Sequence, residues 1–255
     1  PTPPDLFKAL ANEEAIVIPH HTAHVGNFCD WKDHDPRVER LVEIYQLRGS
    51  YECAAEDGNP VPEKSDEMFE QGYVSRALAM GWRAGFTAGG DDHMGHSGTE
   101  FLFQGSGQHG YKAGLMAVLA KDLTRGALWD GLYSRRVIAT TGARVWLTFT
   151  LNGHDMGTEL DAADGTDLAT KRVLDIRFHG TAPLKRIDII RCNEVVHTVE
   201  GEGPDLEASW EDSAALDEVC LPPARFCHHP FCFYYVRAIQ EDGEVAWASP
   251  IWVDP

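Results

Sequence analysis

Short alternating segments, repeated along the second half of the chain, are the feature that most restricts its fold. Residues 145–151 alternate apolar and polar side chains and run into Asn152-Gly153, a dipeptide typical of a tight hairpin turn. A side-chain period of two is that of a strand with one buried face. The same pattern returns, without a helical period, at residues 173–178, 184–190, 194–199, 231–240 and 245–253. This rhythm predicts an Ig-like β-sandwich over residues 146–255.

The first 145 residues have a different rhythm, in which apolar runs alternate with helical patterns. Strands alternating with helices are the signature of parallel βα units. Only about four such units fit, whereas a closed βα barrel takes about 250 residues. We therefore expect residues 1–145 to be an α/β domain, the second half of such a barrel. Its expected strands are residues 15–19, 41–47, 83–88 and 137–140; its expected helices are residues 5–15, a short one from Asp35-Pro36, 68–80, and 125–135 with Thr124 as N-cap.

Two residues with metal-binding chemistry follow the apolar run at residues 83–88. Asp91 and His93 are two positions apart, so on an extended backbone both side chains point to one face. A carboxylate oxygen and an imidazole nitrogen together suit a divalent metal ion. An ordinary polar loop with a chance pair of residues is the alternative interpretation.

A second group of polar residues follows the preceding predicted strands. His20, His21 and His24 come directly after the run at residues 15–19, and ligands in α/β folds bind at the carboxyl ends of strands. Glu43 lies inside an apolar run, where a buried carboxylate needs a partner such as a metal ion. Histidines satisfied by ordinary packing are the alternative. Three of them within five residues favour a ligand role.

Arg144 follows the expected strand at residues 137–140 and is a candidate for binding an anionic group of a substrate. A surface arginine paired with a carboxylate is the simpler interpretation of this residue. The Gly-rich stretch at residues 95–114 is expected to be a long active-site loop.

The six cysteines do not have the spacing of a zinc finger. Cys227 and Cys232 enclose two histidines but lack a second ligand pair, so structural zinc is not favoured there. Buried free thiols, or one disulfide among Cys220, Cys227 and Cys232, are expected instead.

The charge balance restricts the possible partners. The formal net charge of -18 argues against a nucleic-acid-binding surface and against an anionic membrane partner. No apolar run approaches the roughly 18 residues of a membrane span. The chain begins Pro1-Thr2-Pro3-Pro4 and shows no signal peptide, which leaves its compartment, cytoplasmic or periplasmic, undetermined.

Several stretches taken together resemble the carboxyl-terminal part of a DUF3604 protein, a branch of the polymerase-and-histidinol-phosphatase (PHP) superfamily. The resemblance implies a distorted (βα)7 barrel with two or three divalent metal ions (Zn, Mn or Fe) and a hydrolase, most often a phosphoesterase. The stretches that carry it are residues 18–24, 89–95, 123–132, 139–144, 151–157 and 246–252.

The resemblance also implies roles for the site residues. Asp91 and His93 match a late Asp-x-His pair of metal ligands, and His20 or His21, with His21 favoured, matches a histidine that follows a mid-barrel strand. Glu43 matches an acidic ligand on the next strand. The opening His-x-His motif of the family has no counterpart, so the chain is expected to lack an N-terminal barrel segment and to be incomplete as an enzyme. His24, His96 or His93 is then expected to donate a proton to the leaving group, and Arg144 to hold a small anionic substrate.

Three functions are compatible with these residues. A metal-dependent hydrolase of the phosphoesterase type is the leading hypothesis. A non-catalytic ligand-binding protein with a degenerate barrel is the alternative from another class. The third is a metal-dependent hydrolase that acts on a non-phosphate ester or an amide.

Overall fold

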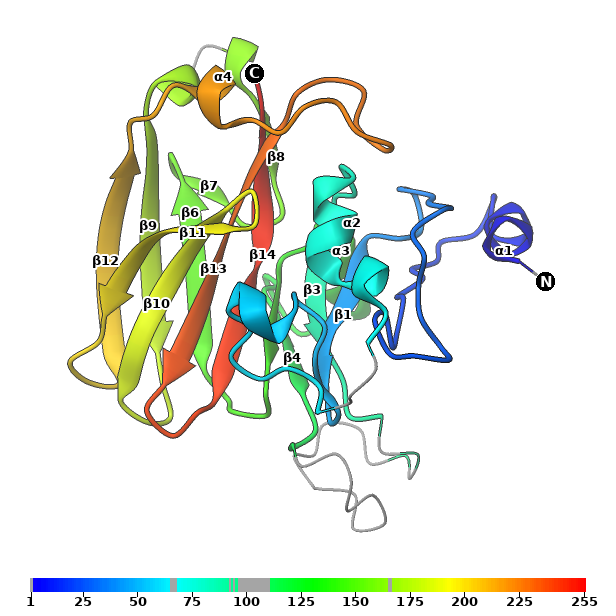
Figure 1. The fold of residues 1–255 in the computed structure, drawn as a ribbon, viewed down its shortest axis with the longest axis horizontal. Coiled ribbons are helices and arrows are strands. Elements are labelled where there is room, and N and C mark those ends of the chain that lie inside the picture. Colours follow the sequence, from blue (N-terminus) through cyan, green and yellow to red (C-terminus); the bar gives the residue numbers. More distant parts are fainter. Residues whose placement is uncertain (1, 65–67, 92, 94, 96–110, 165–166) are drawn as a thin grey trace.

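The computed structural model describes residues 2–64, 68–91, 93, 95, 111–164 and 167–255. Of these residues, 37% lie in strands and 16% in helices. Three sheets organise the chain. Two of them face each other, and the third, smaller one packs beside them and leads toward the N-terminus (Figure 1).

The largest sheet has seven strands and runs through the middle of the molecule. Its strands follow the order β11-β10-β13-β14-β5-β4, and β8 pairs with β14 off this path. The pairs along this path are antiparallel, as in β13 with β14. The strands are β4 (Leu115–Val118), β5 (Val137–Thr140), β8 (Glu159–Asp161), β10 (Leu184–Arg191), β11 (Glu194–Glu200), β13 (Cys232–Gln240) and β14 (Val245–Asp254).

The facing sheet has four strands in the order β12-β9-β6-β7: β6 (Trp146–Leu151), β7 (His154–Asp155), β9 (Arg172–His179) and β12 (Asp205–Asp212). Alternation along β6 buries Leu147, Phe149 and Leu151 while Trp146 is exposed, as the sequence pattern predicts. Asn152 and Gly153 have φ of 47° and 82° in the β6–β7 turn, which glycine and asparagine tolerate best. The predicted pairing of short alternating strands is therefore confirmed over this part of the chain.

The third and smallest sheet has three strands. Its order is β2-β1-β3, with β1 at Leu41–Gln46, β2 at Gly49–Ser50 and β3 at Gly85–Ala88. Strands β1 and β3 are parallel, with Leu41 opposite Gly85. Phe86 lies in one apolar core with Trp247 and Trp252 of β14. The small sheet is thus packed directly on the large one.

The barrel predicted for residues 1–145 is wrong. The described residues form mainly antiparallel sheets with few helices and no closed barrel. Strand β5, expected to be part of a βα unit, pairs antiparallel with both β14 and β4. An apolar run buried on both faces suits either arrangement, because such a run does not specify the direction of its neighbour.

Residues 15–19 do not form the predicted strand. Val17 donates a backbone hydrogen bond to Val38, and Glu43 donates one to Pro19, yet the segment is not assigned to a sheet. Ile18 is 40% exposed, so the apolar run lies at the surface beside the small sheet and is not buried as a strand of it.

The helices agree with the sequence only in part. The best match is α3 (Arg125–Tyr133), whose N-cap Thr124 accepts a hydrogen bond from the Ala127 backbone N–H. Helix α1 covers only Pro3–Ala9, α2 covers Val74–Ala79, α4 is a single turn at Leu216–Val219, and residues after Asp35 form a turn instead of a helix. The remaining helical segments are short 3₁₀ turns at Ala55–Asp57, Glu70–Gly72, Ala162–Asp164 and Asp167–Ala169.

The domain boundary expected at residue 145 stays a prediction. The seven-stranded sheet takes β4 and β5 from before this position and its other strands from after it. The core around Trp247 likewise contains Val42 and Phe86 from the small sheet together with Phe233 from β13.

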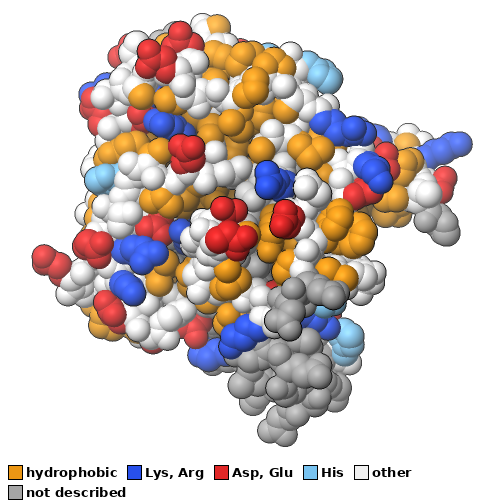
Figure 2. Space-filling model, in the orientation of Figure 1, with side chains coloured by type: hydrophobic (Ala, Val, Ile, Leu, Met, Phe, Trp, Pro, Cys, Tyr) orange, Lys and Arg blue, Asp and Glu red, His pale blue; other side chains and the backbone are white. Residues whose placement is uncertain are grey.

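The surface mixes charges of both signs. On the face shown in Figure 2, acidic and basic side chains are interspersed with exposed apolar ones. Within the described part of the chain, no helix has the length and apolar character needed to cross a lipid bilayer.

Asp212, at the end of β12, links the two sheets of the sandwich and makes the fold sensitive to acid. Its Oδ2 accepts hydrogen bonds from Tyr234 Oη at 2.6 Å and Arg191 Nη1 at 2.8 Å. Burial alone raises the pKa of Asp212, but these hydrogen bonds and the charge of Arg172 lower it below its ordinary value of 3.8. Its contribution to stability is therefore present above the unfolded pKa and is lost as pH falls through the lowered folded pKa.

We expect Asp212→Asn to lower the melting temperature at about pH 7 and to shrink the loss of stability between about pH 7 and pH 3. Thermal unfolding followed by circular dichroism at both pH values measures this. The matched control is Asp205→Asn, because Asp205 on the same strand is 68% exposed at its side chain and pairs only at the surface with His179. An equal acid sensitivity in the wild type and in Asp212→Asn would contradict the prediction.

Candidate metal centre

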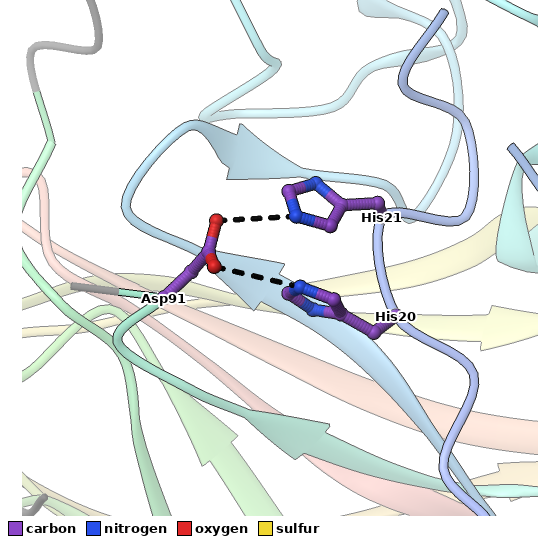
Figure 3. Close-up of side chains that lie close together, drawn as sticks. All are labelled: His20, His21 and Asp91. Carbon is purple, nitrogen blue, oxygen red and sulfur yellow. Dashed lines mark ion pairs between the residues drawn. The ribbon is translucent and has the colours of Figure 1, made fainter. Parts of the chain in front are cut away.

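Three side chains from two separate segments converge beside the small parallel sheet. His20 and His21 follow the segment that Pro19 attaches to β1, and Asp91 follows β3 after two glycines. Figure 3 shows both imidazoles facing the carboxylate of Asp91. The carboxyl ends of parallel strands meet at one edge of a sheet, which is why residues after β3 reach this position.

The donor atoms have the separations of a shared ion site. His20 Nε2 lies 3.5 Å from Asp91 Oδ1, and His21 Nε2 lies 3.2 Å from Asp91 Oδ2. One ligand atom from each of the three residues lies within 4.8 Å of the other two. Two imidazole nitrogens and a carboxylate oxygen form a donor set that suits zinc, manganese or iron.

Glu43 contacts His20 on the side of its ring that faces away from Asp91. Its Oε2 lies 2.6 Å from His20 Nδ1, the nitrogen that does not face Asp91. A carboxylate on the second nitrogen of an imidazole fixes the ring and its tautomer, as the outer partners of metal-binding histidines do. Gly89 leaves room for it, because a Cβ at this position would lie 2.8 Å from Glu43 Oε1. The structure thus places Glu43 in contact with a candidate ligand and outside the group of three.

Two polar residues of the same site were not predicted from the sequence. Gln46 Nε2 donates to Asp91 Oδ2 at 3.2 Å, and Arg48 Nη1 forms an ion pair with the same oxygen. Both lie at the carboxyl end of β1, where it turns into β2. Asp91 was selected because it follows the carboxyl end of a strand, and Gln46 and Arg48 meet the same criterion. Their position at the end of β1 could therefore have identified them from the sequence.

The environment sets the protonation of the donors. Burial and the adjacent His20 lower the pKa of His21 to about 4, so its imidazole is neutral near pH 7. The hydrogen bond that His20 donates to the Glu43 carboxylate raises the pKa of His20. Burial opposes ionisation of Asp91, but Arg48 and the imidazoles outweigh it and lower the pKa of the carboxyl. Burial raises the pKa of Glu43, although His20 acts against that shift.

The backbone at this site is in a conformation that side chains seldom adopt. His21, Asp91 and His93 have φ of 57°, 48° and 56°, in the left-handed region. Such positions cost energy and cluster at ligand sites. The extended backbone from which Asp91 and His93 were expected to share a face is therefore not observed.

His93 still reaches the carboxylate, by another route. Its Nε2 lies 3.0 Å from Asp91 Oδ1, while its side chain is 72% exposed. It therefore contacts one member of the group from the solvent side, and its assignment as a metal ligand stays a prediction.

His24 forms a separate pair with Glu63, outside the group of three. Its Nδ1 lies 2.8 Å from Glu63 Oε1, and its ring centroid lies 5.5 Å from that of His21. Glu63 Oε2 is buried without a hydrogen-bond partner. This carboxylate was not predicted, because it lies in a polar loop that shows no periodic pattern.

The other two predicted site residues are not in the group. Arg144 is exposed in the connection between β5 and β6, and its role in substrate binding stays a prediction. His96, expected to be catalytic, lies outside the described residues.

A second set of donor residues lies around the carboxyl end of β14. Cys227, His229 and Asp254 also place ligand atoms within 4.8 Å of one another. Arg83 Nη2, however, lies 2.7 Å and 2.8 Å from the two oxygens of Asp254 and 3.7 Å from Cys227 Sγ. Arg83 thus contacts both oxygens of Asp254, whereas Arg48 contacts one oxygen of Asp91, so we interpret the second set as an ion-pair network.

Comparison with known proteins agrees with part of the sequence analysis. Residues 84–173 match the model of DUF3604, a family described as protein of unknown function. The resemblance to DUF3604 is thereby confirmed over this segment, which includes β3, Asp91 and the first strands of the sandwich, whereas membership of the PHP superfamily stays a prediction.

The relatives are longer than this chain. An uncharacterized protein of Chlamydia pneumoniae is 37% identical over 250 residues, which is 98% of this chain and 40% of that protein. Uncharacterized proteins of Chlamydia muridarum and Chlamydia trachomatis are each 36% identical over 252 residues with the same coverage. The chain thus spans 40% of the length of these curated relatives. No solved structure matches it.

Proposed function

We propose that His20, His21 and Asp91 bind a divalent metal ion and that the protein is a metal-dependent hydrolase of the phosphoesterase type. The observation that carries the proposal is the convergence of these three donors from segments some seventy residues apart. The resemblance to PHP hydrolases supports the reaction class. The three donors lie beside the small parallel sheet, so the site needs no barrel to bring them together.

The residues fit an ion chemically. His21 is neutral near pH 7 and Asp91 is ionised, so each presents a lone pair. Glu43 holds the far nitrogen of His20 and raises its pKa, so binding of an ion through Nε2 would release a proton from His20. Arg48 competes for one oxygen of Asp91, but a carboxylate has lone pairs enough for both partners. Three donors suffice for one ion with an open position. The second and third ions that the resemblance implies need donors beyond this group.

A bound divalent ion would lower the pKa of a water molecule and withdraw charge from a phosphoryl oxygen. The chain's own residues have complementary tasks. Glu63 holds His24 by its Nδ1, which leaves Nε2 to exchange a proton with a leaving group. Arg48 is only 17% exposed at its side chain and supplies a fixed positive charge for an anionic substrate.

Metal binding is the first test. We expect purified protein to bind Zn²⁺ or Mn²⁺ at a single site, and Asp91→Ala to lower the affinity by more than about 100-fold, beyond the usual cost of an outer-shell change. Isothermal titration calorimetry and elemental analysis of dialysed protein measure this. The matched control is Asp205→Ala, which removes the carboxylate of a surface Asp–His pair with Oδ1 at 3.0 Å from His179 Nδ1. Equal affinities for the wild type and Asp91→Ala would refute the metal site.

Hydrolysis is tested separately on the intact protein. A panel of phosphate monoesters and diesters, assayed with and without a chelator, should show metal-dependent release of phosphate or alcohol that Asp91→Ala abolishes. Metal binding without hydrolysis of any ester would retain the site and overturn the catalytic proposal, in favour of a ligand-binding protein. Hydrolysis confined to amides or other esters would overturn the phosphoesterase class alone.

A further inference from the structure

Two cysteines that are forty residues apart in sequence meet at one end of the seven-stranded sheet. Cys192 lies in the turn between β10 and β11, and Cys232 begins β13. Their Sγ atoms are 3.5 Å apart, and both cysteines are free thiols. The sequence pattern had suggested buried free thiols, or one disulfide among Cys220, Cys227 and Cys232, and all three are free thiols. Cys192 was not considered because it stands alone in the sequence.

The turn that carries Cys192 is unusual and firmly held. Cys192 and Asn193 have φ of 50° and 71°, the signs that a two-residue hairpin turn of type I′ requires at both positions. Asparagine and glycine favour this conformation, whereas cysteine gains nothing from it locally. The Cys192 backbone N–H donates to Phe233 at 3.0 Å, and Asn193 Nδ2 donates to Ser75 at 2.8 Å. These bonds hold the Cys192 sulfur next to that of Cys232.

The two thiols differ in a way that suits a stepwise reaction. The pKa of Cys192 is lowered, chiefly by its hydrogen bond with Cys232, and Arg191 acts in the same direction. Burial raises the pKa of Cys232 well above its ordinary value, and this residue is fully enclosed. Cys192 is partly exposed. An oxidant thus meets Cys192 first, with Cys232 in place to react with the product.

We propose that Cys192 and Cys232 form a disulfide when the protein meets a thiol oxidant such as glutathione disulfide. The Cys192 thiolate attacks one sulfur of glutathione disulfide, the sulfur–sulfur bond breaks, and one glutathione leaves as thiolate. Cys232 then loses its proton and attacks the Cys192 sulfur, which forms the protein disulfide and releases the second glutathione. Two electrons pass from the protein to glutathione disulfide, and the two thiol protons end on the two glutathiones.

The bond requires little movement. The sulfur atoms must approach by about 1.5 Å to reach the usual disulfide length of about 2.05 Å. Three other thiols are less suited, including Cys220, whose pKa burial raises to about 11. Burial raises the pKa of Cys29 to about 12 and also raises that of Cys53. The bond would tie the β10–β11 turn to β13, which is otherwise attached there through backbone hydrogen bonds.

Peptide mapping of the intact protein tests the proposal, and the sequence dictates its design. Trypsin leaves Cys192 and Cys220 together in residues 192–225, and Cys227 and Cys232 together in residues 226–237, because no Lys or Arg separates them. Digestion must therefore add Glu-C, which cleaves at six glutamates between Cys192 and Cys220, and chymotrypsin, which cleaves after Phe231. Protein equilibrated in graded ratios of reduced to oxidised glutathione is quenched with an alkylating agent before digestion.

We expect a cross-linked species joining the Cys192 and Cys232 peptides, two hydrogens lighter than their sum, which increases with the oxidised fraction and disappears on reduction. Oxidation should raise the melting temperature of the wild type and leave that of Cys192→Ser unchanged. Cys53→Ser is the control that should retain the cross-link. A cross-link of Cys192 to Cys220, or glutathione retained on Cys192 with Cys232 free, would overturn the proposal, as would alkylation of both thiols at every ratio.

Discussion

Replacing Arg237 with methionine is expected to destabilise the protein by about 3–5 kcal/mol, the usual cost of leaving a buried charge without its partner. Arg237 lies on β13 and is 3% exposed. Its Nη1 lies 3.0 Å from Glu52 Oε2, and its Nη2 lies 2.9 Å from Asp188 Oδ2. Both carboxylates are 2% exposed. The variant leaves Glu52 buried without a cation, while Asp188 keeps Arg186, whose Nε lies 2.9 Å from Asp188 Oδ1. Urea unfolding followed by tryptophan fluorescence measures the loss.

Two controls separate the unpaired charge from the loss of packing. Lys171→Met removes the cation of a surface ion pair with Glu211 and should leave the unfolding free energy unchanged. The double variant Glu52→Gln, Arg237→Met should recover part of the loss, because Glu52 is then neutral and Asp188 keeps its ion pair with Arg186. If Arg237→Met and Lys171→Met have the same stability, the buried network does not contribute as proposed.

The same network connects the small sheet to the sandwich. Glu52 follows β2 of the small sheet, and its carboxylate also accepts hydrogen bonds from Tyr235 Oη at 2.8 Å and from Trp247 Nε1 at 2.7 Å. Among the described residues, each side-chain donor to the Glu52 carboxylate comes from β13 or β14 of the large sheet. The position of β1, and with it of Glu43 and Gln46, is therefore fixed by residues more than 180 positions later in the chain.

The sandwich was predictable because its period is local. Leu147, Phe149 and Leu151 alternate with polar residues, and one buried face forces that alternation whatever the strand pairs with. The order of the strands was not predictable in this way. Ile138 in β5 lies opposite Ala248 in β14, a partner that no local pattern indicates. Because the apolar run of β5 does not specify the direction of its neighbouring strands, it was interpreted as a strand of a barrel.

Part of the candidate site was predictable from the sequence. The positions of its residues after apolar runs bring them together, and not the extended backbone that was expected at Asp91 and His93. His20, His21 and Asp91 were selected because they follow apolar runs, and the parallel pairing of β1 with β3 does bring the end of β3 toward the first of these segments. The left-handed backbone at His21 and Asp91 was not foreseen, since positive φ in residues other than glycine leaves no trace in composition. Glu63 was missed because one polar residue in a loop resembles any other, whereas Arg48 lies at a strand end and could have been selected by that position.

The role of Glu43 gives the second large expected effect, and it rests on the proposed metal site. Glu43→Gln should lower the affinity for Zn²⁺ or Mn²⁺ by about 10- to 100-fold, the usual cost of losing an outer-shell partner. The physical reason is the 2.6 Å contact between Glu43 Oε2 and His20 Nδ1, because a neutral amide holds the imidazole less firmly than a carboxylate does. Competition titration with a chromophoric chelator measures the affinity.

Glu63→Gln is the matched control, because Glu63 makes the same kind of contact with a different histidine, 2.8 Å from His24 Nδ1. It should leave metal affinity unchanged and lower the rate of ester hydrolysis, since His24 is assigned to proton transfer and not to the ion. A loss in Glu43→Gln as large as in Asp91→Ala would make Glu43 a direct ligand, as the family resemblance implies. Equal losses in Glu43→Gln and Glu63→Gln would instead place His24 at the ion and require the two histidine–carboxylate pairs to be treated as one site.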